Sequence, residues 1–212
     1  MLTKTIYLIR HGETELNRQG VVQGSGIDSD LNEVGLMQAN AFFEAYQDIN
    51  FDKIYTSKLR RTVQSVQEFI NLGIPYEQLE GLNEISWGEK EGKVPNYLAD
   101  ENYHEIIANW SKGKTNVPAA KGGESPEQVV ARQAVAFEKI MSRTSESVIL
   151  VAMHGRAIRI LLTHLLQLPL LAMDTFSHSN LCLYRLNYSY ETQAFQLDIT
   201  NDISHLVETL VG

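Results

Sequence analysis

The amino-acid sequence predicts a three-layer αβα sandwich with a mostly parallel central sheet and an inserted helical cap. Short apolar, β-branched runs alternate along the chain with segments of helical periodicity. The runs at 4–9 and 147–153 are almost continuously apolar, as parallel strands covered on both faces require. Polar residues directly follow three of the runs, and sites in this fold class gather at the carboxyl ends of strands.

The individual elements follow from local patterns. Strands are predicted at residues 4–9, 52–57, 147–153, 180–186 and 193–199, and helices at 32–46, 59–72 and 156–166. In the first helix Leu36, Ala39 and Phe43 recur at helical spacing. Gly73 and Pro75 end the second helix, because neither residue continues a helix well.

Residues 93–123 interrupt this alternation. The segment contains tyrosines, a tryptophan, two prolines and a Gly-Gly pair, but no clear strand. Long insertions in compact domains often serve as lids. We therefore predict that residues 1–212 form a single domain and that 93–123 is a helical cap over its site. The alternative is a surface excursion without a functional role.

Composition limits the classes of partner. Of 212 residues 43% are hydrophobic and 21% charged, which is ordinary globular usage and argues against disorder. The formal net charge of −8 disfavours nucleic acid and anionic membranes as partners, because like charges repel. A single cysteine, Cys182, permits no internal disulfide, and neither a signal peptide nor a membrane-spanning run is visible. We expect a cytoplasmic protein that binds neither nucleic acid nor membrane.

Histidine and arginine side chains collect at three predicted strand ends. Residues 10–14 (Arg-His-Gly-Glu-Thr), 57–62 (Ser-Lys-Leu-Arg-Arg-Thr) and 154–156 (His-Gly-Arg) each follow a strand. Arginine offers forked donors that match a phosphoryl group, and a neutral imidazole is a good nucleophile near pH 7. A leaving alkoxide needs a proton, so a carboxylic acid is expected nearby. This combination favours phosphoryl transfer.

The first of these segments resembles the signature of the histidine phosphatase superfamily, also called the phosphoglycerate-mutase-like family. The match covers residues 8–14 (Leu-Ile-Arg-His-Gly-Glu-Thr), which are followed by Asn17. The resemblance implies that His11 is the nucleophile, that Arg10 binds the phosphoryl group and that Asn17 lines the phosphate site.

The resemblance continues over nearly the whole chain. Residues 23–39 follow the family's next stretch in order and spacing, with Gln23 as a further substrate-binding residue. Asp30 stands where the family usually has a proline, which we expect to affect the loop more than the chemistry. The Ser-x-Leu-x-Arg-Thr run matches the second signature and makes Arg61, rather than its neighbour Arg60, the phosphate-binding arginine.

Two later segments extend the resemblance. Residues 82–92 look like the family's proton-donor segment, which makes Glu84 the candidate general acid. The other carboxylates expected near the site are Glu13, Glu89 and Glu91. The Val-Ala-Met-His-Gly run at 151–155 matches the last signature, so that His154 would bind the phosphoryl group and Gly155 would contact the substrate.

The resemblance implies a metal-independent phosphomonoesterase of the histidine acid type, without a cofactor, that acts on a small phosphorylated metabolite through a phosphohistidine at His11. No metal-ligand spacing is present, since the chain has neither a His-Glu-x-x-His run nor a cysteine pair. A cofactor-dependent phosphoglycerate mutase is the first alternative. Family mutases resemble longer chains, whereas the Gly-Gly-Glu-Ser run at 122–125 and Arg156 look more like the small phosphatases. A non-catalytic phosphate-binding or regulatory module is the second alternative, and the sequence leaves open the substrate and a homodimer.

Overall fold

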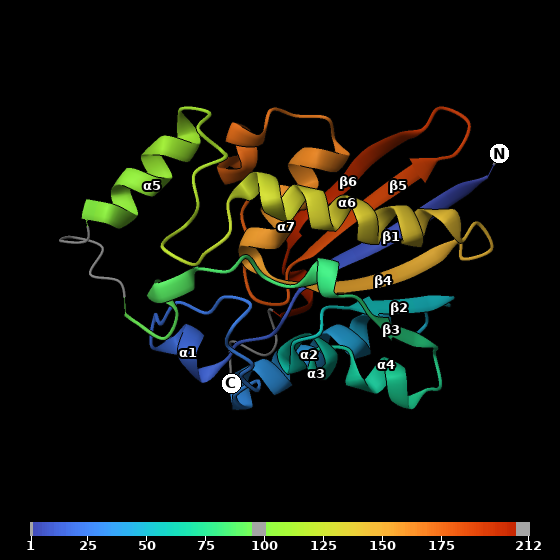
Figure 1. The fold of residues 1–212 in the computed structure, drawn as a ribbon. Coiled ribbons are helices and arrows are strands. Elements are labelled where there is room, and N and C mark those ends of the chain that lie inside the picture. The colour runs from blue at the N-terminus through green and yellow to red at the C-terminus, as the bar shows by residue number, and fades with distance from the viewer. Residues whose placement is uncertain (1, 95–100, 207–212) are drawn as a thin grey trace.

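The computed structural model describes residues 2–94 and 101–206, and a mixed sheet of six strands lies at its centre (Figure 1). The strands are β1 (Thr3–Arg10), β2 (Lys53–Thr56), β3 (Tyr76–Gln78), β4 (Val148–Met153), β5 (Leu183–Ser189) and β6 (Ala194–Asp202). Their order is β3-β2-β4-β1-β5-β6. The first four strands are parallel to one another, and β5 and β6 are antiparallel to their neighbours. The predicted, mostly parallel sheet is therefore confirmed.

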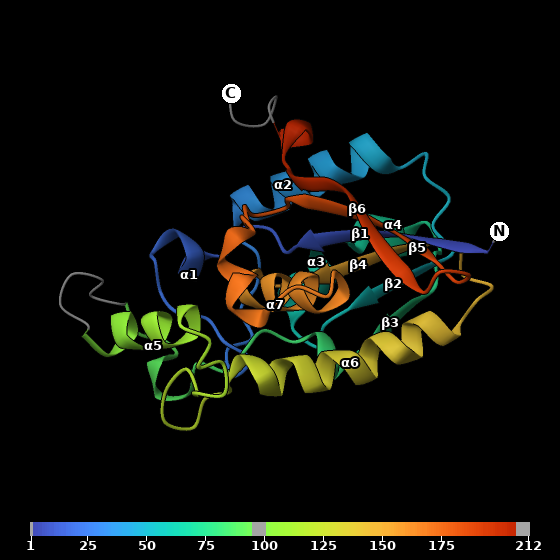
Figure 2. The same ribbon diagram turned by 90° about the horizontal axis from the view of Figure 1, so that it is seen from above.

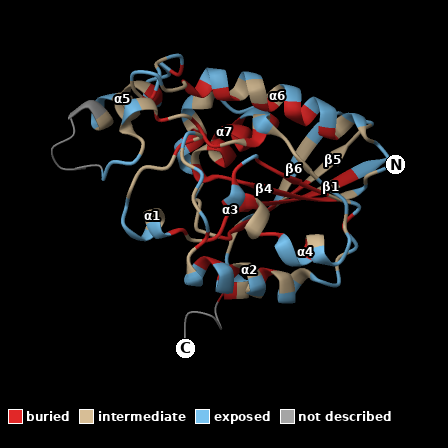
Figure 3. Cartoon of the chain, turned by 60° about the horizontal axis from the view of Figure 1, so that its bottom comes forward, coloured by how far each residue is buried: buried red, intermediate tan, exposed pale blue. Residues whose placement is uncertain are grey.

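Helices cover both faces of the sheet (Figures 1 and 2). One face carries α6 (Pro126–Ser142) and α7 (Gly155–Leu165), and the other carries α2 (Glu33–Tyr46), α3 (Arg60–Gln64) and α4 (Gln67–Asn71). Phe137 of α6 and Leu161 of α7 pack into one apolar cluster with the strands, and Phe42 of α2 and Phe69 of α4 pack into the other. Figure 3 shows buried residues along the strands and on the sides of helices α6 and α7. The predicted three-layer sandwich is confirmed.

Short helices complete the described chain. They are α1 (Glu15–Arg18), α5 (Glu101–Ser111) and the 3-10 helices Glu80–Leu82, Gly88–Lys90, Leu170–Thr175 and Ser204–Leu206. Over these same ranges no helix combines the length and apolar character needed to cross a membrane. No group of three or more His, Cys, Asp or Glu residues in the described parts of the chain is placed to hold a metal ion.

The structure differs from the predicted elements at three places. The helix predicted at 59–72 is two short helices, because Val66 between them leaves the helical region at φ −124 and ψ 14. Strand β3 was not predicted, since three residues are too few for a periodicity to appear. Helix α6 was also missed, although Ser125 and Gln128 form a capping box that the Ser-Pro-Glu-Gln run encodes.

Within the described part of the predicted cap, residues 101–111 form helix α5, and residues 112–123 form turns and irregular structure. Residues 95–100, which include Tyr97 of the predicted cap, lie outside the described residues. Trp110 of α5 is fully buried in an apolar cluster with Trp87 and Ile160 of α7. Its indole N–H donates to the carbonyl oxygen of Val117 at 2.8 Å. Helix α5 is thereby fixed next to the start of α7; its role as a cap stays a prediction.

Candidate active site

Three strand ends meet at one edge of the sheet. Strand β4 lies between β1 and β2 and is parallel to both, so the residues that follow the three strands are neighbours in space. His11 follows β1, Ser57 follows β2 and His154 follows β4. The two imidazole rings lie 5.2 Å apart between centroids. The structure thus brings together the residues that the sequence placed at strand ends.

His11 has a defined tautomer and a lowered pKa. Its side chain is only 4% exposed, and Nδ1 lies 2.7 Å from the carbonyl oxygen of Gly12. A carbonyl can only accept, so Nδ1 carries the proton and Nε2 keeps the lone pair. Burial, followed by the positive charges of Arg61 and Arg10, lowers the pKa of His11 well below its ordinary value. The ring is therefore neutral at pH 7.

His154 has the opposite tautomer. Arg61 Nε donates to His154 Nδ1 at 3.2 Å, and a guanidinium can only donate. The proton of the neutral ring is therefore on Nε2, which donates to Ser57 Oγ at 2.8 Å. Ser57 Oγ also accepts from the backbone N–H of Leu59 at 3.1 Å. Burial and the charge of Arg61 lower the pKa of His154 well below its ordinary value, as for His11.

Arg61, rather than Arg60, points into the site. Arg61 is fully buried and donates to the carbonyl oxygens of Ile27 at 2.6 Å and Gly24 at 3.3 Å, besides its bond to the histidine. Burial lowers the pKa of Arg61 to about 10, so the guanidinium remains charged at pH 7. Arg60 is exposed and pairs with Asp28 at 3.1 Å. The structure therefore places these two arginines as the sequence predicted.

Arg10 and Gly155 lie in contact at this edge. Arg10 Nη1 donates to the carbonyl oxygen of His178 at 2.6 Å, whereas Arg10 Nε is buried and has no hydrogen-bond partner in the described structure. A Cβ atom on Gly155 would lie 3.4 Å from Arg10 Nε and from the ring of His178. A glycine here keeps the space around the unpaired donor free, which suits an incoming anion.

Asn17 of α1 and Gln23 of the loop that follows it share Thr14 as a hydrogen-bond partner. Asn17 Oδ1 accepts from the backbone N–H of Thr14 at 3.2 Å, and Gln23 Nε2 donates to Thr14 Oγ1 at 2.6 Å. Asn180 Nδ2 donates both to Asn17 Oδ1 at 3.4 Å and to the carbonyl oxygen of His11 at 3.1 Å. These bonds tie both amides to Thr14 in the segment that follows β1, and Asn180 links Asn17 to His11. Their contact with a substrate stays a prediction.

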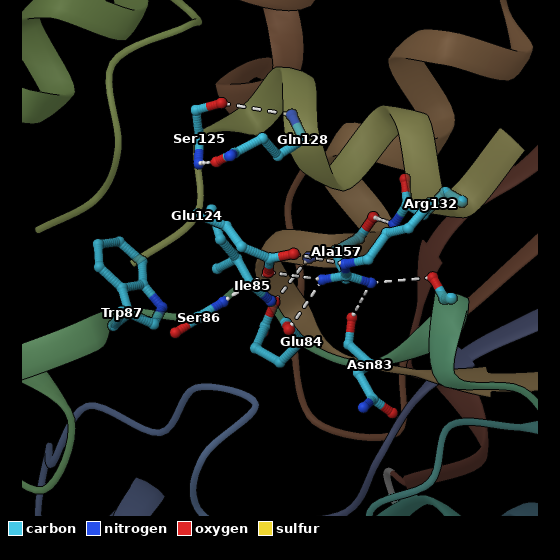
Figure 4. Close-up of polar contacts among 12 residues, drawn as sticks. Asn83, Glu84, Ile85, Ser86, Trp87, Glu124, Ser125, Gln128, Arg132 and Ala157 are labelled. Atoms are coloured by element: carbon cyan, nitrogen blue, oxygen red, sulfur yellow. Dashed lines mark hydrogen bonds and ion pairs between the residues drawn. The ribbon is translucent and has the colours of Figure 1, made fainter. Parts of the chain in front are cut away.

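Glu84 binds the first turn of α7 through its carboxyl group. The residue is 6% exposed, and Oε1 accepts from the backbone N–H groups of Ala157 at 2.8 Å and Ile85 at 2.9 Å. Oε2 accepts from the backbone N–H of Arg156 at 3.1 Å. Figure 4 shows the contact between Glu84 and Ala157. Since α7 begins directly after His154, these bonds bring the carboxyl group to the edge where the imidazoles lie. Oε1 of Glu91, another predicted candidate, accepts from the backbone N–H of Trp87 at 3.0 Å and from the hydroxyl group of Ser86 at 3.4 Å.

Sequence reasoning named Arg156 at the third strand end but missed Arg159, which joins it in a group of cations next to this edge. Arg156 and Arg159 of α7 both form ion pairs with Asp174, the second at 2.6 Å. The Arg156 guanidinium also lies over the ring of Trp110, 5.5 Å from its centroid. Arg159 Nε is buried without a hydrogen-bond partner in the described chain. The sequence could have indicated this group, because Arg156 and Arg159 are three residues apart in a predicted helix and residues at that spacing share a helix face.

Comparison with known proteins identifies the family. The model of the histidine phosphatase superfamily, branch 1, matches residues 6–202. The chain belongs to this superfamily. The matched range includes all three strand ends and Glu84, and the superfamily membership inferred from the sequence is thereby confirmed.

Three relatives show what this superfamily member is similar to. The chain is 34% identical over 203 residues to 6-phosphofructo-2-kinase/fructose-2,6-bisphosphatase 1 of Mus musculus, covering 92% of the chain and 40% of the relative. Phosphoserine phosphatase of Entamoeba histolytica, solved with 3-phosphoglyceric acid, has a TM-score of 0.82 at 27% identity and covers 96% of this chain and 100% of that one. The YhfR protein of Bacillus stearothermophilus has a TM-score of 0.82 at 26% identity, covering 96% and 99%. The chain spans about two-fifths of the length of the curated relative.

Proposed function

We propose that this chain is a metal-independent phosphomonoesterase that acts on a small phosphorylated metabolite through a phosphohistidine at Nε2 of His11. The observation that carries the proposal is the state of His11, which is neutral and has its proton on Nδ1. The lone pair on Nε2 is then available to attack phosphorus. Relatives of the same superfamily that carry phosphatase names support hydrolysis as the reaction.

In the first step Nε2 attacks phosphorus in line, and a P–N bond forms as the ester P–O bond breaks. Arg10, Arg61 and His154 are the groups that would meet the transferred phosphoryl, and arginine donors stabilise the charge on its oxygens. Glu84 gives its proton to the leaving oxygen, so that the alcohol departs uncharged. Oε2 of this carboxyl group accepts only one backbone N–H and keeps a lone pair that can hold the proton.

In the second step a water molecule attacks the phosphohistidine. The carboxylate of Glu84 takes a proton from the water as its oxygen bonds to phosphorus and the P–N bond breaks. Inorganic phosphate is released, and His11 and the protonated Glu84 return to their starting states. Water is the acceptor in a phosphatase, whereas a mutase holds a second substrate hydroxyl in its place.

We further infer that the substrate carries a second acidic group. Arg156 and Arg159 place two guanidinium groups against one carboxylate, that of Asp174, and Arg159 Nε is unpaired. An anionic group of the substrate could bind these donors by forked hydrogen bonds. Relatives named for fructose 2,6-bisphosphate and phosphoserine, both of which have a second acidic group, support this class. We also propose that the enzyme acts on free metabolites in the cytoplasm.

The test measures phosphate release from a panel of phosphomonoesters with and without a second acidic group, in the presence of EDTA. Release should survive EDTA, and it should disappear in His11→Asn, which keeps a side chain of similar size without an imidazole. Arg159→Gln should raise KM more for substrates with the second acidic group than for p-nitrophenyl phosphate. Interconversion of 3- and 2-phosphoglycerate without phosphate release would favour a mutase. Neither phosphate release nor this interconversion would favour a binding module.

A further inference from the structure

Helix α6 carries no predicted site residue, yet its Arg132 binds the segment that presents Glu84 (Figure 4). Arg132 Nη1 donates to the carbonyl oxygens of Gly81 and Asn83, both at 2.9 Å. Arg132 Nη2 donates to the carbonyl oxygen of Glu84 itself, also at 2.9 Å. One guanidinium therefore binds three carbonyl groups within four consecutive residues.

The remaining bonds of this guanidinium go to Glu124. Arg132 Nε donates to Glu124 Oε1 at 2.8 Å, and Arg132 Nη2 donates to Oε2 at 3.0 Å. Glu124 Oε2 also accepts from the backbone N–H of Ser86 at 2.8 Å. The Arg132–Glu124 pair thus binds carbonyl groups up to Glu84 and an N–H group two residues beyond it. The two side chains are 22% and 25% exposed. If their hydrogen bonds were lost, water would therefore reach only some of the backbone groups that they bind.

The segment needs such partners because little regular structure satisfies its backbone. Residues 80–82 form one 3-10 turn, and 83–87 form neither helix nor strand. Buried backbone N–H and C=O groups that lack secondary-structure partners must be paired by side chains or water. The carboxyl group of Glu84 is bound on its far side by Ala157 of α7, and Gln133 of α6 donates to the carbonyl oxygen of Ala157 at 2.8 Å. The two helices and the segment form one connected unit.

We propose that Arg132, oriented by Glu124, is a positioning residue that holds the backbone of residues 81–86 so that the Glu84 carboxyl group stands at the start of α7. This inference rests on the proposed role of Glu84 as the general acid. Lysine cannot substitute, because an ammonium group lacks the planar fork that spans three carbonyl oxygens and a carboxylate. A looser segment would misplace the proton donor while leaving His11, Arg10 and Arg61 on their own elements.

The experiment compares turnover of an alkyl phosphate, whose leaving oxygen needs the proton, with that of p-nitrophenyl phosphate, whose leaving oxygen does not. Misplacing a catalytic group by about 1 Å costs up to about 10²-fold in rate. We therefore expect Arg132→Lys to lower kcat for the alkyl phosphate by at least about tenfold more than for the aryl phosphate. Arg143→Lys is the matched control, because Arg143 pairs with Glu77 at 2.6 Å at the other end of α6. It should leave the ratio of the two rates unchanged.

Glu84→Gln separates this inference from the proposed function. It should show the same preference for the aryl phosphate, and adding Arg132→Lys to it should increase that preference no further. If Glu84→Gln lowers both rates equally, Glu84 is not the general acid, and the positioning role proposed for Arg132 is refuted as well. If Glu84→Gln discriminates but Arg132→Lys lowers both rates equally, Arg132 only holds the fold. Glu124→Gln is the second variant should Arg132→Lys not fold, and it should give the same ratio shift.

Discussion

Acidification is expected to destabilise the folded protein through His11 and His154. The pKa of each ring lies well below 6.5 in the folded protein, chiefly because burial disfavours the charged form and next because Arg61 repels it. In the unfolded chain both rings return to an ordinary pKa near 6.5. Below that pH the unfolded chain binds more protons than the folded one. The stability from neutral burial is therefore present above pH 6.5 and is lost as the pH falls.

The size of the effect follows from the ordinary pKa of imidazole. One pKa unit corresponds to about 1.36 kcal/mol. A ring with pKa 6.5 when unfolded, and neutral throughout when folded, removes about 2 kcal/mol from the free energy of unfolding between pH 7.5 and pH 5. The two rings together remove at most about 4 kcal/mol, the amount reached when both stay neutral down to pH 5, against the 5–15 kcal/mol typical of a folded domain.

Urea unfolding at pH 7.5, 6 and 5 tests this prediction, in buffers without phosphate because a bound anion would stabilise the folded state. The loss of stability between pH 7.5 and pH 5 should be smaller in His11→Asn than in the wild type, by up to about 2 kcal/mol. His164→Asn, which removes an exposed imidazole, is the matched control and should keep the wild-type loss. If His11→Asn loses as much stability on acidification as the wild type, His11 is not held neutral by burial and the reasoning is refuted.

Three further substitutions probe the packing around the site. Ser57→Ala leaves the Nε2–H of His154 and a backbone N–H buried without an acceptor, and should lower the free energy of unfolding in urea by about 2–4 kcal/mol; a loss under about 1 kcal/mol would contradict the assigned tautomer. Gly35→Ala would place a Cβ 2.1 Å from the carbonyl oxygen of Glu13, so stability should fall by about 1–3 kcal/mol and kcat should fall with it. Trp110→Ala should cost about 3–5 kcal/mol in the same unfolding assay, and an unchanged midpoint would show that α5 does not depend on this side chain.

The sequence by itself predicted the layers of the fold and the candidate residues of the site. Continuously apolar runs predict parallel strands buried on both faces, because only such strands avoid water on both sides. The residues after these runs then share one edge, so the sequence predicts that His11 and His154 lie together, and their ring centroids are 5.2 Å apart. The register of Arg61 against Arg60 also followed from the signature. Helix α6 also has a signal in the sequence, because Ser125 and Gln128 form its capping box.

Only the tertiary structure decided which proton each site residue carries and what holds it in place. The tautomer of His154 depends on Arg61, 93 positions away, and on Ser57, 97 positions away. The carboxyl group of Glu84 is bound by an N–H 73 positions away, and its backbone by Arg132, 48 positions away. Hydrogen bonds depend on distances of about 3 Å and on direction. The spacing of residues along the sequence does not give the distance or direction between groups that the fold brings together. These contacts can therefore be identified only from the assembled sheet and helices α6 and α7.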